Sequence, residues 1–434
     1  YDMDINGNLQ ENATKFGTNE KSVSEYSHGG SINIGYTFAD VLKLKYTKLY
    51  TRTALDSTRI VDGIIGSNYD HLFKYYLEWE ERILNADQIS GEFDYQIFNK
   101  KSTLNFGFER ANANLYQPNN FHYAYIDEQD KIFVDNTISN HLASRLQSDD
   151  ELLAMYVNNK VELDILSPED YLDVGFKISS KERVSRQNKF FLRSIGGSGV
   201  EDSDLTGDIE SIYYEYVRNN IPYDERAFLV SPLFTPADYF DAYVDEMNFY
   251  TNVFMKPYEN LEIMAGLRYV DFTQKVDQYV EDRNNPDMSL RRLIKKVPEQ
   301  LDIQDIYPSV SAKYKIDEQN QVDLAISRTF IAPDLREFTS GRYRHPYEAA
   351  EIEGNPELVN TDIYSFDLKY SHFFSDTENI KTGIFFKYLD KPIEDVMIPS
   401  SSLPIYSFDN SDYATLYGIE VDGRKNLGFL HNTL

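Results

Sequence analysis

The sequence predicts an all-β fold, a large antiparallel transmembrane β-barrel, on three observations. Apolar and polar residues alternate with period two over long runs, most clearly in residues 364–374 and 380–388. Alternation over about nine or more residues gives a tilted strand the length it needs to cross a bilayer. The runs meet in pairs at short turns, and long polar inserts separate the pairs. This asymmetry is typical of outer-membrane barrels, which have short periplasmic turns and long extracellular loops.

Period-two patterning predicts about fourteen strands along the chain. The stretch around Trp79 alternates almost as well as it follows a helical period, and its neighbours favour a strand. The expected strands are residues 31–38, 41–53, 72–83, 88–98, 103–114, 151–166, 171–184, 246–256, 261–276, 306–314, 321–330, 362–374, 380–389 and 414–425.

Proline, aspartate and asparagine mark the expected turns, because they preset turn dihedrals or cap the turn. Short turns are expected at residues 39–40, 167–170, 257–260, 317–320 and 375–379. Long inserts are expected at residues 116–149, 186–245, 277–305 and 332–361. A compact soluble domain rarely carries several unstructured loops of this length, whereas a barrel projects them outward, where they can bind a ligand.

Alternation also predicts which side chains face lipid, because successive side chains of a strand point to opposite faces. In one strand we expect lipid contacts from Tyr364, Phe366, Leu368 and Tyr370, and inward positions for Ser365, Asp367 and Lys369. The same pattern predicts a polar interior wall formed by Asn248, Asn252, Arg268, Asp323, Asp367, Lys369, Lys387, Glu420 and Asp422.

Composition excludes several classes of protein. The net charge of −28 argues against nucleic acid as a partner, since phosphate neutralisation needs clustered lysine and arginine. The chain has no cysteine, which removes disulfide, thiolate-metal and cysteine-nucleophile chemistry. No apolar run approaches the roughly 20 residues of a membrane-spanning helix. The 34 tyrosines and 27 phenylalanines are too many for a disordered chain and suit aromatic girdles at a membrane interface.

Three sequence boxes, in this order and spacing, resemble the C-terminal half of the barrel of TonB-dependent outer-membrane receptors. The first box ends a strand at Pro333, the second begins with Gly354, Asn355 and Pro356, and the third contains Gly418 and Glu420. Each box is short, but together they make the resemblance fairly specific. The resemblance is dense beyond about residue 90 and thin before it.

The resemblance implies an active transporter of the bacterial cell outer membrane, which is not an enzyme and needs no cofactor. Such a receptor binds a scarce nutrient, for example a siderophore, haem, cobalamin, a glycan or a peptide, at its extracellular loops. A TonB-type energising protein, acting through a plug, drives import, and outer-membrane lipids and lipopolysaccharide surround the barrel. Residues 1–434 are then expected to form a single barrel domain that is truncated at both ends. The alternatives are a passive porin or an export or assembly barrel, and a soluble all-β adhesin or glycan-binding protein.

No catalytic or metal-binding residue is predicted. A Gly-x-Ser-x-Gly elbow and His-Glu-x-x-His spacing are both absent from the sequence. His345 lies between the first and second boxes, where haem-uptake members of the family carry a ligating histidine, and imidazole is a normal axial ligand of haem iron. The flanking boxes have the general form of the family rather than the haem-receptor form. They therefore favour an ordinary loop histidine, with haem ligation as the alternative.

Overall fold

The computed structural model describes residues 15–65, 71–128, 131–134, 142–194, 208, 210–211, 228–233, 238–281, 293–295, 298–339, 342–344, 351–398 and 405–426. Among these residues, no helix has the length and apolarity that crossing a membrane requires.

β-Strands make up almost all of the described chain, and they pair antiparallel except for one short parallel ladder between residues 351–353 and 405–407. They are β1 (Lys15–Phe38), β2 (Leu42–Ile65), β3 (His71–Ile97), β4 (Lys100–Glu128), β5 (Lys131–Val134), β6 (Leu142–Glu162), β7 (Tyr171–Ser194), β8 (Phe228–Leu233), β9 (Tyr239–Tyr258), β10 (Leu261–Glu281), β11 (Leu293–Lys295), β12 (Glu299–Lys315), β13 (Asn320–Ile331), β14 (Arg342–Arg344), β15 (Glu351–Glu353), β16 (Thr361–Ser375), β17 (Glu378–Asp390), β18 (Ile393–Ile398), β19 (Ile405–Asn410) and β20 (Tyr413–Arg424).

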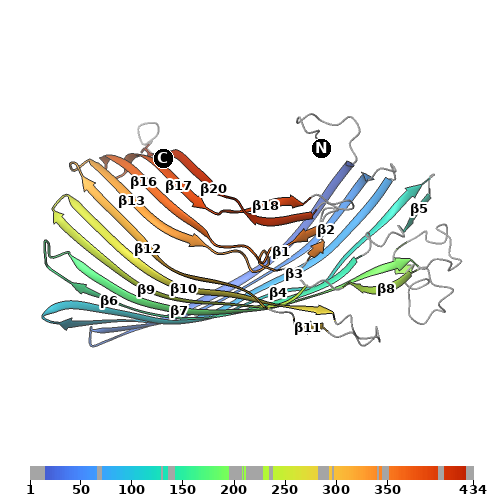
Figure 1. The fold of residues 1–434 in the computed structure, drawn as a ribbon, viewed down its shortest axis with the longest axis horizontal. Helices are drawn as coiled ribbons and strands as arrows, with labels where there is room; N and C mark the ends of the chain where they lie inside the picture. Colours follow the sequence, from blue (N-terminus) through green and yellow to red (C-terminus); the bar gives the residue numbers. More distant parts are fainter. Residues whose placement is uncertain are drawn as a thin grey trace.

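Thirteen of these strands pair in the order β1-β2-β3-β4-β6-β7-β9-β10-β12-β13-β16-β17-β20. Each neighbour in the sheet is therefore the next long strand along the chain, as in an up-and-down barrel. The sheet curves strongly but is not closed, because no ladder joins β1 to β20 among the described residues (Figure 1). A second, four-stranded sheet, β14-β15-β19-β18, lies at one rim. The predicted all-β, antiparallel barrel architecture is confirmed.

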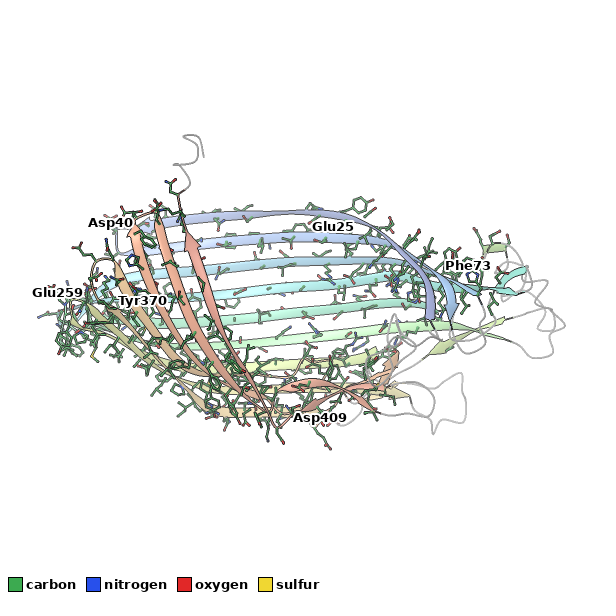
Figure 2. The ribbon with its side chains drawn as sticks, turned by 90° about the horizontal axis from the view of Figure 1, so that it is seen from above. Glu25, Asp40, Phe73, Glu259, Tyr370 and Asp409 are labelled. Atoms are coloured by element: carbon green, nitrogen blue, oxygen red, sulfur yellow. The ribbon has the colours of Figure 1, made fainter. Side chains whose placement is uncertain are left out.

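The short turns gather at one rim and the longer connections at the other (Figure 1). Asp40 and Glu259 mark the turn rim in Figure 2, and Phe73 and Asp409 lie toward the opposite, loop rim. Two of the turns have two residues with positive φ, Ala39-Asp40 and Phe98-Asn99. Positive φ at both central residues matches the right-handed twist of the flanking strands, and this keeps the hairpins tight.

Several predicted boundaries are wrong, because the ladders continue well beyond the alternating segments. The predicted strands 72–83 and 88–98 are one strand, β3. Much of the predicted inserts 116–149, 186–245 and 277–305 belongs to β4, β6, β7, β9, β10 and β12. Toward the loop rim the alternation becomes irregular, because apolar side chains occur on the inner face as well, as Phe240 and Val276 do, and prolines and runs of polar residues interrupt the pattern, although pairing persists. Pro118 lies where the β4–β6 register shifts, between Gln117 and Asn120, as expected of a residue without an N–H donor.

One face of the sheet carries an apolar band that crosses all thirteen long strands. The register places its members side by side, because cross-strand partners share a face. Each is more than a third exposed. One member from each strand is Ile34, Tyr46, Ile89, Phe108, Met155, Ile178, Phe249, Tyr269, Val310, Ile326, Phe366, Phe386 and Tyr417. A continuous exposed belt of this kind is the surface that a lipid bilayer covers.

The other face is polar, as the alternation predicts. Lys369 forms an ion pair with Asp323 at 3.3 Å across β16 and β13. All nine residues predicted for the interior wall lie on this inner face, since they alternate with the apolar band. A ring covers the glycine Gly418 here, where an added Cβ would lie 2.7 Å from Cζ of Phe385. The small residue of this motif therefore makes room for an aromatic neighbour on the inner wall.

We predict that a lysine at position 368 destabilises the barrel in lipid by about 2–4 kcal/mol, because the side chain near the centre of the apolar band must leave water. Leu368→Lys should be compared with Ser365→Lys, which places the same charge on the polar face and should have little effect. Chemical unfolding of both variants in lipid vesicles measures the difference. Equal losses would show that the band does not face lipid.

We predict that acid weakens the β6–β7 turn through Asp170. This side chain is buried, and burial raises its pKa. The backbone N–H groups of Lys256, Leu166 and Ser167 donate to the carboxylate at 2.8, 2.6 and 2.9 Å and outweigh burial, so the pKa lies below its usual range. A carboxyl group whose pKa is lower in the folded than in the unfolded protein stabilises the fold at pH values above its unfolded-state pKa of about 3.9. This stabilisation is lost as the pH falls through the folded-state pKa.

Asp170→Asn should therefore lower stability at neutral pH and reduce the loss of stability on acidification. The matched control is Asp376→Asn, an exposed turn residue at the same rim. Denaturant titrations between neutral and acidic pH test both variants. An unchanged acid profile in Asp170→Asn would contradict the prediction.

Candidate functional site

The connection from β13 to β16 folds back over the inner face of the sheet. β13 ends at Ile331, and the buried Pro333 accepts a hydrogen bond at its carbonyl oxygen from Nε2 of Gln274 at 3.1 Å. Beyond it, apolar side chains of the connection pack on inner-face residues of β9 and β10. The buried cluster is Phe240, Ala242, Val276, Leu335, Phe338 and Leu358. The main apolar core thus lies at the loop side of the sheet, where it fixes this connection in place.

Gly354 and Asn355 fix the C-terminal part of the same connection, in contacts that are called the clamp below. A Cβ on Gly354 would lie 2.3 Å from the carbonyl oxygen of Thr339, with two further backbone oxygens within 3 Å. Asn355 donates its backbone N–H to the carbonyl oxygen of Glu337 at 2.7 Å and its Nδ2 to that of Phe408 at 3.0 Å. These contacts join the β13–β16 connection to the β18–β19 hairpin. The motif residues hold the structure of the rim together.

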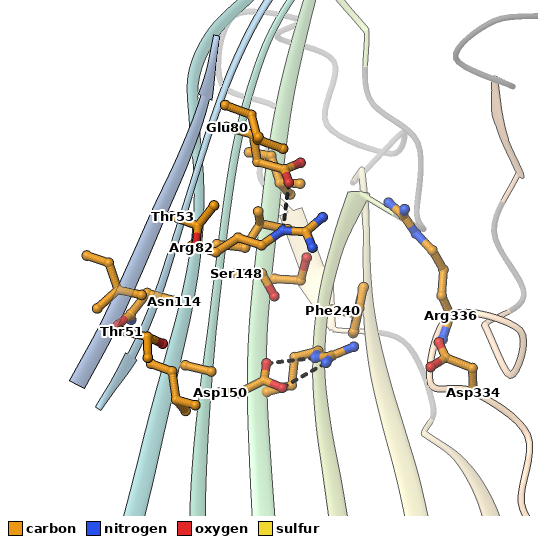
Figure 3. Close-up of a pocket in the computed structure, with 18 of the residues that line it drawn as sticks. Thr51, Thr53, Glu80, Arg82, Asn114, Ser148, Asp150, Phe240, Asp334 and Arg336 are labelled. Atoms are coloured by element: carbon orange, nitrogen blue, oxygen red, sulfur yellow. Dashed lines mark hydrogen bonds and ion pairs between the residues drawn. The ribbon is translucent and has the colours of Figure 1, made fainter. Parts of the chain in front are cut away.

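A cavity of about 650 Å³ lies between this connection and the inner face of the sheet (Figure 3). Its floor comes from β1, β2, β3, β4, β6, β7 and β9, and Asp334 and Arg336 of the connection form its other side. On β2 the lining residues Thr51, Thr53 and Leu55 follow the apolar-band residue Tyr46 in the direction of the loop rim. The cavity is therefore at the mouth of the barrel, on the loop side of the band.

Two cross-strand rows build the cavity floor. Neighbours in a row occupy directly opposite positions in successive ladders, so they share a face and lie within contact distance. One row runs Thr53, Arg82, Leu115, Ser148, Ser185 and Phe240. The adjacent row runs Thr51, Leu84, Ala113, Asp150 and Arg183. Residues from six strands thus meet in one surface.

Paired charges characterise the floor. Arg183 makes a bidentate contact with Asp150 through Nε and Nη2, both at 2.7 Å, and Lys181 adds a contact at 3.1 Å. Arg82 contacts Glu80 through Nε at 2.6 Å, while its side chain stays 67% exposed. Figure 3 labels Glu80, Arg82 and Asp150 and draws their contacts as dashed lines. This arrangement offers hydrogen-bond donors and acceptors together, which suits binding rather than proton-transfer chemistry.

The structure separates the residues predicted from sequence into two groups. Pro333, Gly354, Asn355 and Pro356 lie at the rim and in the connection above the cavity, whereas Gly418 and Glu420 lie on the inner face of the edge strand β20. His345 is outside the described residues.

The cavity residues were not identified from sequence. Arg82, Asp150 and Arg183 come together through strand register and are far apart along the chain. Among the described residues, no group of three histidine or carboxylate side chains is placed to hold a metal ion.

Comparison with known proteins agrees with this architecture. Residues 3–433 match the family described as TonB dependent receptor-like, beta-barrel. This is a family of Gram-negative outer-membrane receptors and not of enzymes, so the prediction that the chain is not an enzyme is confirmed. No curated protein matches the chain in sequence.

Among solved structures, the chain is similar to the ferric-catecholate import receptor Fiu of E. coli K12, with a TM-score of 0.48 and 9% identity over 97% of this chain and 63% of that one. It is also similar to the siderophore receptor PiuA of Acinetobacter baumannii, with a TM-score of 0.49 and 12% identity over 94% and 61%. A third similar structure is the pyoverdine receptor FpvA of Pseudomonas aeruginosa PAO1 bound to pyoverdine. Its TM-score is 0.45, and the sequence identity is 12% over 96% of this chain and 60% of that one. The chain thus spans less than two thirds of the length of each.

We predict that Gly354→Ala loosens the clamp and destabilises the rim by about 1–3 kcal/mol, as overpacking does when the neighbours are rigid. The clashing atoms are backbone oxygens, which have little room to move. Gly383→Ala is the matched control, because the nearest atom to its added Cβ is 3.7 Å away. Limited proteolysis of the folded protein should cut the β13–β16 connection faster in Gly354→Ala alone. Equal cleavage in both variants would contradict the assignment.

Proposed function

Because the chain belongs to the family of TonB-dependent receptor-like β-barrels, we propose that it forms the barrel of an active transporter in the bacterial outer membrane. The transporter binds a scarce nutrient at its outer mouth and imports it with energy from a TonB-type partner. The candidate nutrients are a siderophore, haem, cobalamin, a glycan or a peptide. Residues 1–434 act as a single barrel domain of this receptor, with further parts of the protein outside the segment.

The observation that carries the proposal is the position of the cavity relative to the apolar band. The band is on the outer face, where lipid and lipopolysaccharide would contact it, and the cavity is on the inner face nearer the loop rim. Since barrels of this kind keep short turns in the periplasm, the cavity opens toward the cell exterior. A binding site at that position meets nutrients before they enter the lumen.

Import against a gradient needs a second component, because a site with equal affinity on both sides of a membrane transports nothing net. We propose that a plug, remodelled by the TonB-type partner, docks on the polar inner wall around Asn248, Asn252, Arg268 and Asp367. In this structure Asn248 is buried and donates to Glu246 at 2.7 Å, and Arg268 lies over the ring of Tyr307 at 5.5 Å. Asn252 and Arg268 are half-buried and Asp367 is exposed, so these three side chains, and not the buried Asn248, form the polar surface that is open to the lumen.

A passive porin is the second candidate, and energised uptake distinguishes it. We predict that cells producing the complete receptor accumulate one member of a labelled panel only when the TonB-type partner is present. The panel contains a ferric siderophore, haemin, cyanocobalamin, maltoheptaose and a tryptic digest of casein. Deleting the partner, or the plug, should abolish accumulation above the external concentration. Uptake that is unchanged by both deletions would identify a passive pore.

A further inference from the structure

The charges around the mouth cavity disfavour an anionic ligand. Its lining contains three guanidinium groups, Arg82, Arg183 and Arg336, and four carboxylates, Glu25, Glu80, Asp150 and Asp334. Arg82 and Arg183 each already contact a carboxylate of the same lining. The whole chain carries 71 acidic against 43 basic side chains, so its long-range field also repels anions. A ferric chelate of high negative charge would find no unopposed cluster of cations among these residues.

The described part of the lining offers little that suits a glycan or haem. Within that part, Phe240 is the one aromatic residue, and it is 3% exposed because it packs in the cluster under the β13–β16 connection. A sugar ring therefore meets no open aromatic face on which to stack. Among the described residues that line the cavity there is no histidine that could ligate haem iron.

What the lining does offer is complementary to a peptide. The Nη atoms of Arg82 make no hydrogen bond among the described residues, so they can donate to the C-terminal carboxylate of a peptide in a bidentate contact. Glu25, without an ion pair in the described chain, can receive an ammonium group. Hydroxyls of Thr51, Thr53 and Ser148 can bond backbone amides. Apolar side chains between them can contact apolar residues of the ligand; these are Leu55, Leu84, Leu115 and Leu146.

The shape of the floor agrees with an extended ligand. The first row crosses six strands from β2 to β9, and the second crosses five from β2 to β7. Neighbouring strands are about 4.8 Å apart, so the rows extend over about 24 Å and about 19 Å. A fully extended chain rises about 3.3–3.6 Å per residue, so about five to seven residues cover these lengths. We propose, resting on the receptor function above, that the mouth cavity binds short oligopeptides of neutral or positive net charge.

The test uses the complete receptor, purified in detergent, and a tryptic digest of casein as the probe. Peptides that remain bound after gel filtration are identified by mass spectrometry. We expect retention of short peptides of neutral or positive charge, and about tenfold or greater weakening in Arg82→Gln, the loss expected for one charge-assisted hydrogen bond. The control is Arg52→Gln, which also removes an arginine–glutamate contact, here the bidentate one to Glu81 at 2.8 Å, but on the opposite face of β2.

A second variant guards against a folding defect in the first. Glu25→Gln should keep total peptide binding within a few-fold of the wild type but lose the preference for positively charged peptides. Ferric enterobactin, haemin and maltoheptaose serve as competing probes. Binding of one of these in the cavity, weakened by Arg82→Gln, would overturn the peptide assignment and leave the receptor function intact. Absence of binding by every probe, together with uptake that ignores the TonB-type partner, would overturn the receptor function itself.

Discussion

The antiparallel ladder is the constraint on which the rest of the structure depends. Because each strand pairs with the next in fixed register, period-two alternation in one strand continues into its neighbour on the same face. Thirteen strands in succession thereby turn a local pattern into two continuous surfaces, an apolar belt and a polar wall. A slip of one residue between any two strands would place apolar side chains in the lumen. The same register aligns Thr53, Arg82 and Ser148 in one row, so the cavity floor depends on the ladder as much as the belt does.

The rim solves a different physical problem. The backbone N–H and C=O groups of a segment that leaves a sheet need new hydrogen-bond partners. In a loop exposed to solvent, water can be that partner. Here the β13–β16 connection instead buries Phe338 and Leu358 against β9 and β10. Gly354 permits the close approach of backbone to backbone, and Asn355 satisfies groups on two separate segments. Apolar burial and directional hydrogen bonds together convert a loop into one side of a binding cavity.

The sequence predicts this fold better than it predicts the site, and the difference has a physical cause. Tyr364, Phe366 and Leu368 alternate with polar residues, because one face meets lipid, so the strand is evident from its own residues. In residues 116–128 the alternating aromatics Phe121, Tyr123 and Tyr125 form only a short run that follows Pro118 and two asparagines, so the segment reads as a loop although it pairs with β3 and β6. Arg82 and Asp150 are unremarkable residues in their own strands. Their proximity follows from register across β3, β4 and β6, which no short window of sequence contains.

The charged side chains of the inner wall affect which ligands the cavity can bind, and the fold alone does not determine their arrangement. A polar interior tolerates many arrangements of acidic and basic side chains, provided that water or partners satisfy them. In the cavity, Arg82 and Arg183 each lie at hydrogen-bond distance from a carboxylate. The negative charge of these carboxylates reduces the positive electrostatic potential that an anionic ligand would meet. A ligand must then compete through oriented hydrogen bonds and apolar contact rather than through net charge. Such a site selects by the positions of its donors and acceptors, and the proposed peptide ligand carries both kinds of group along its backbone.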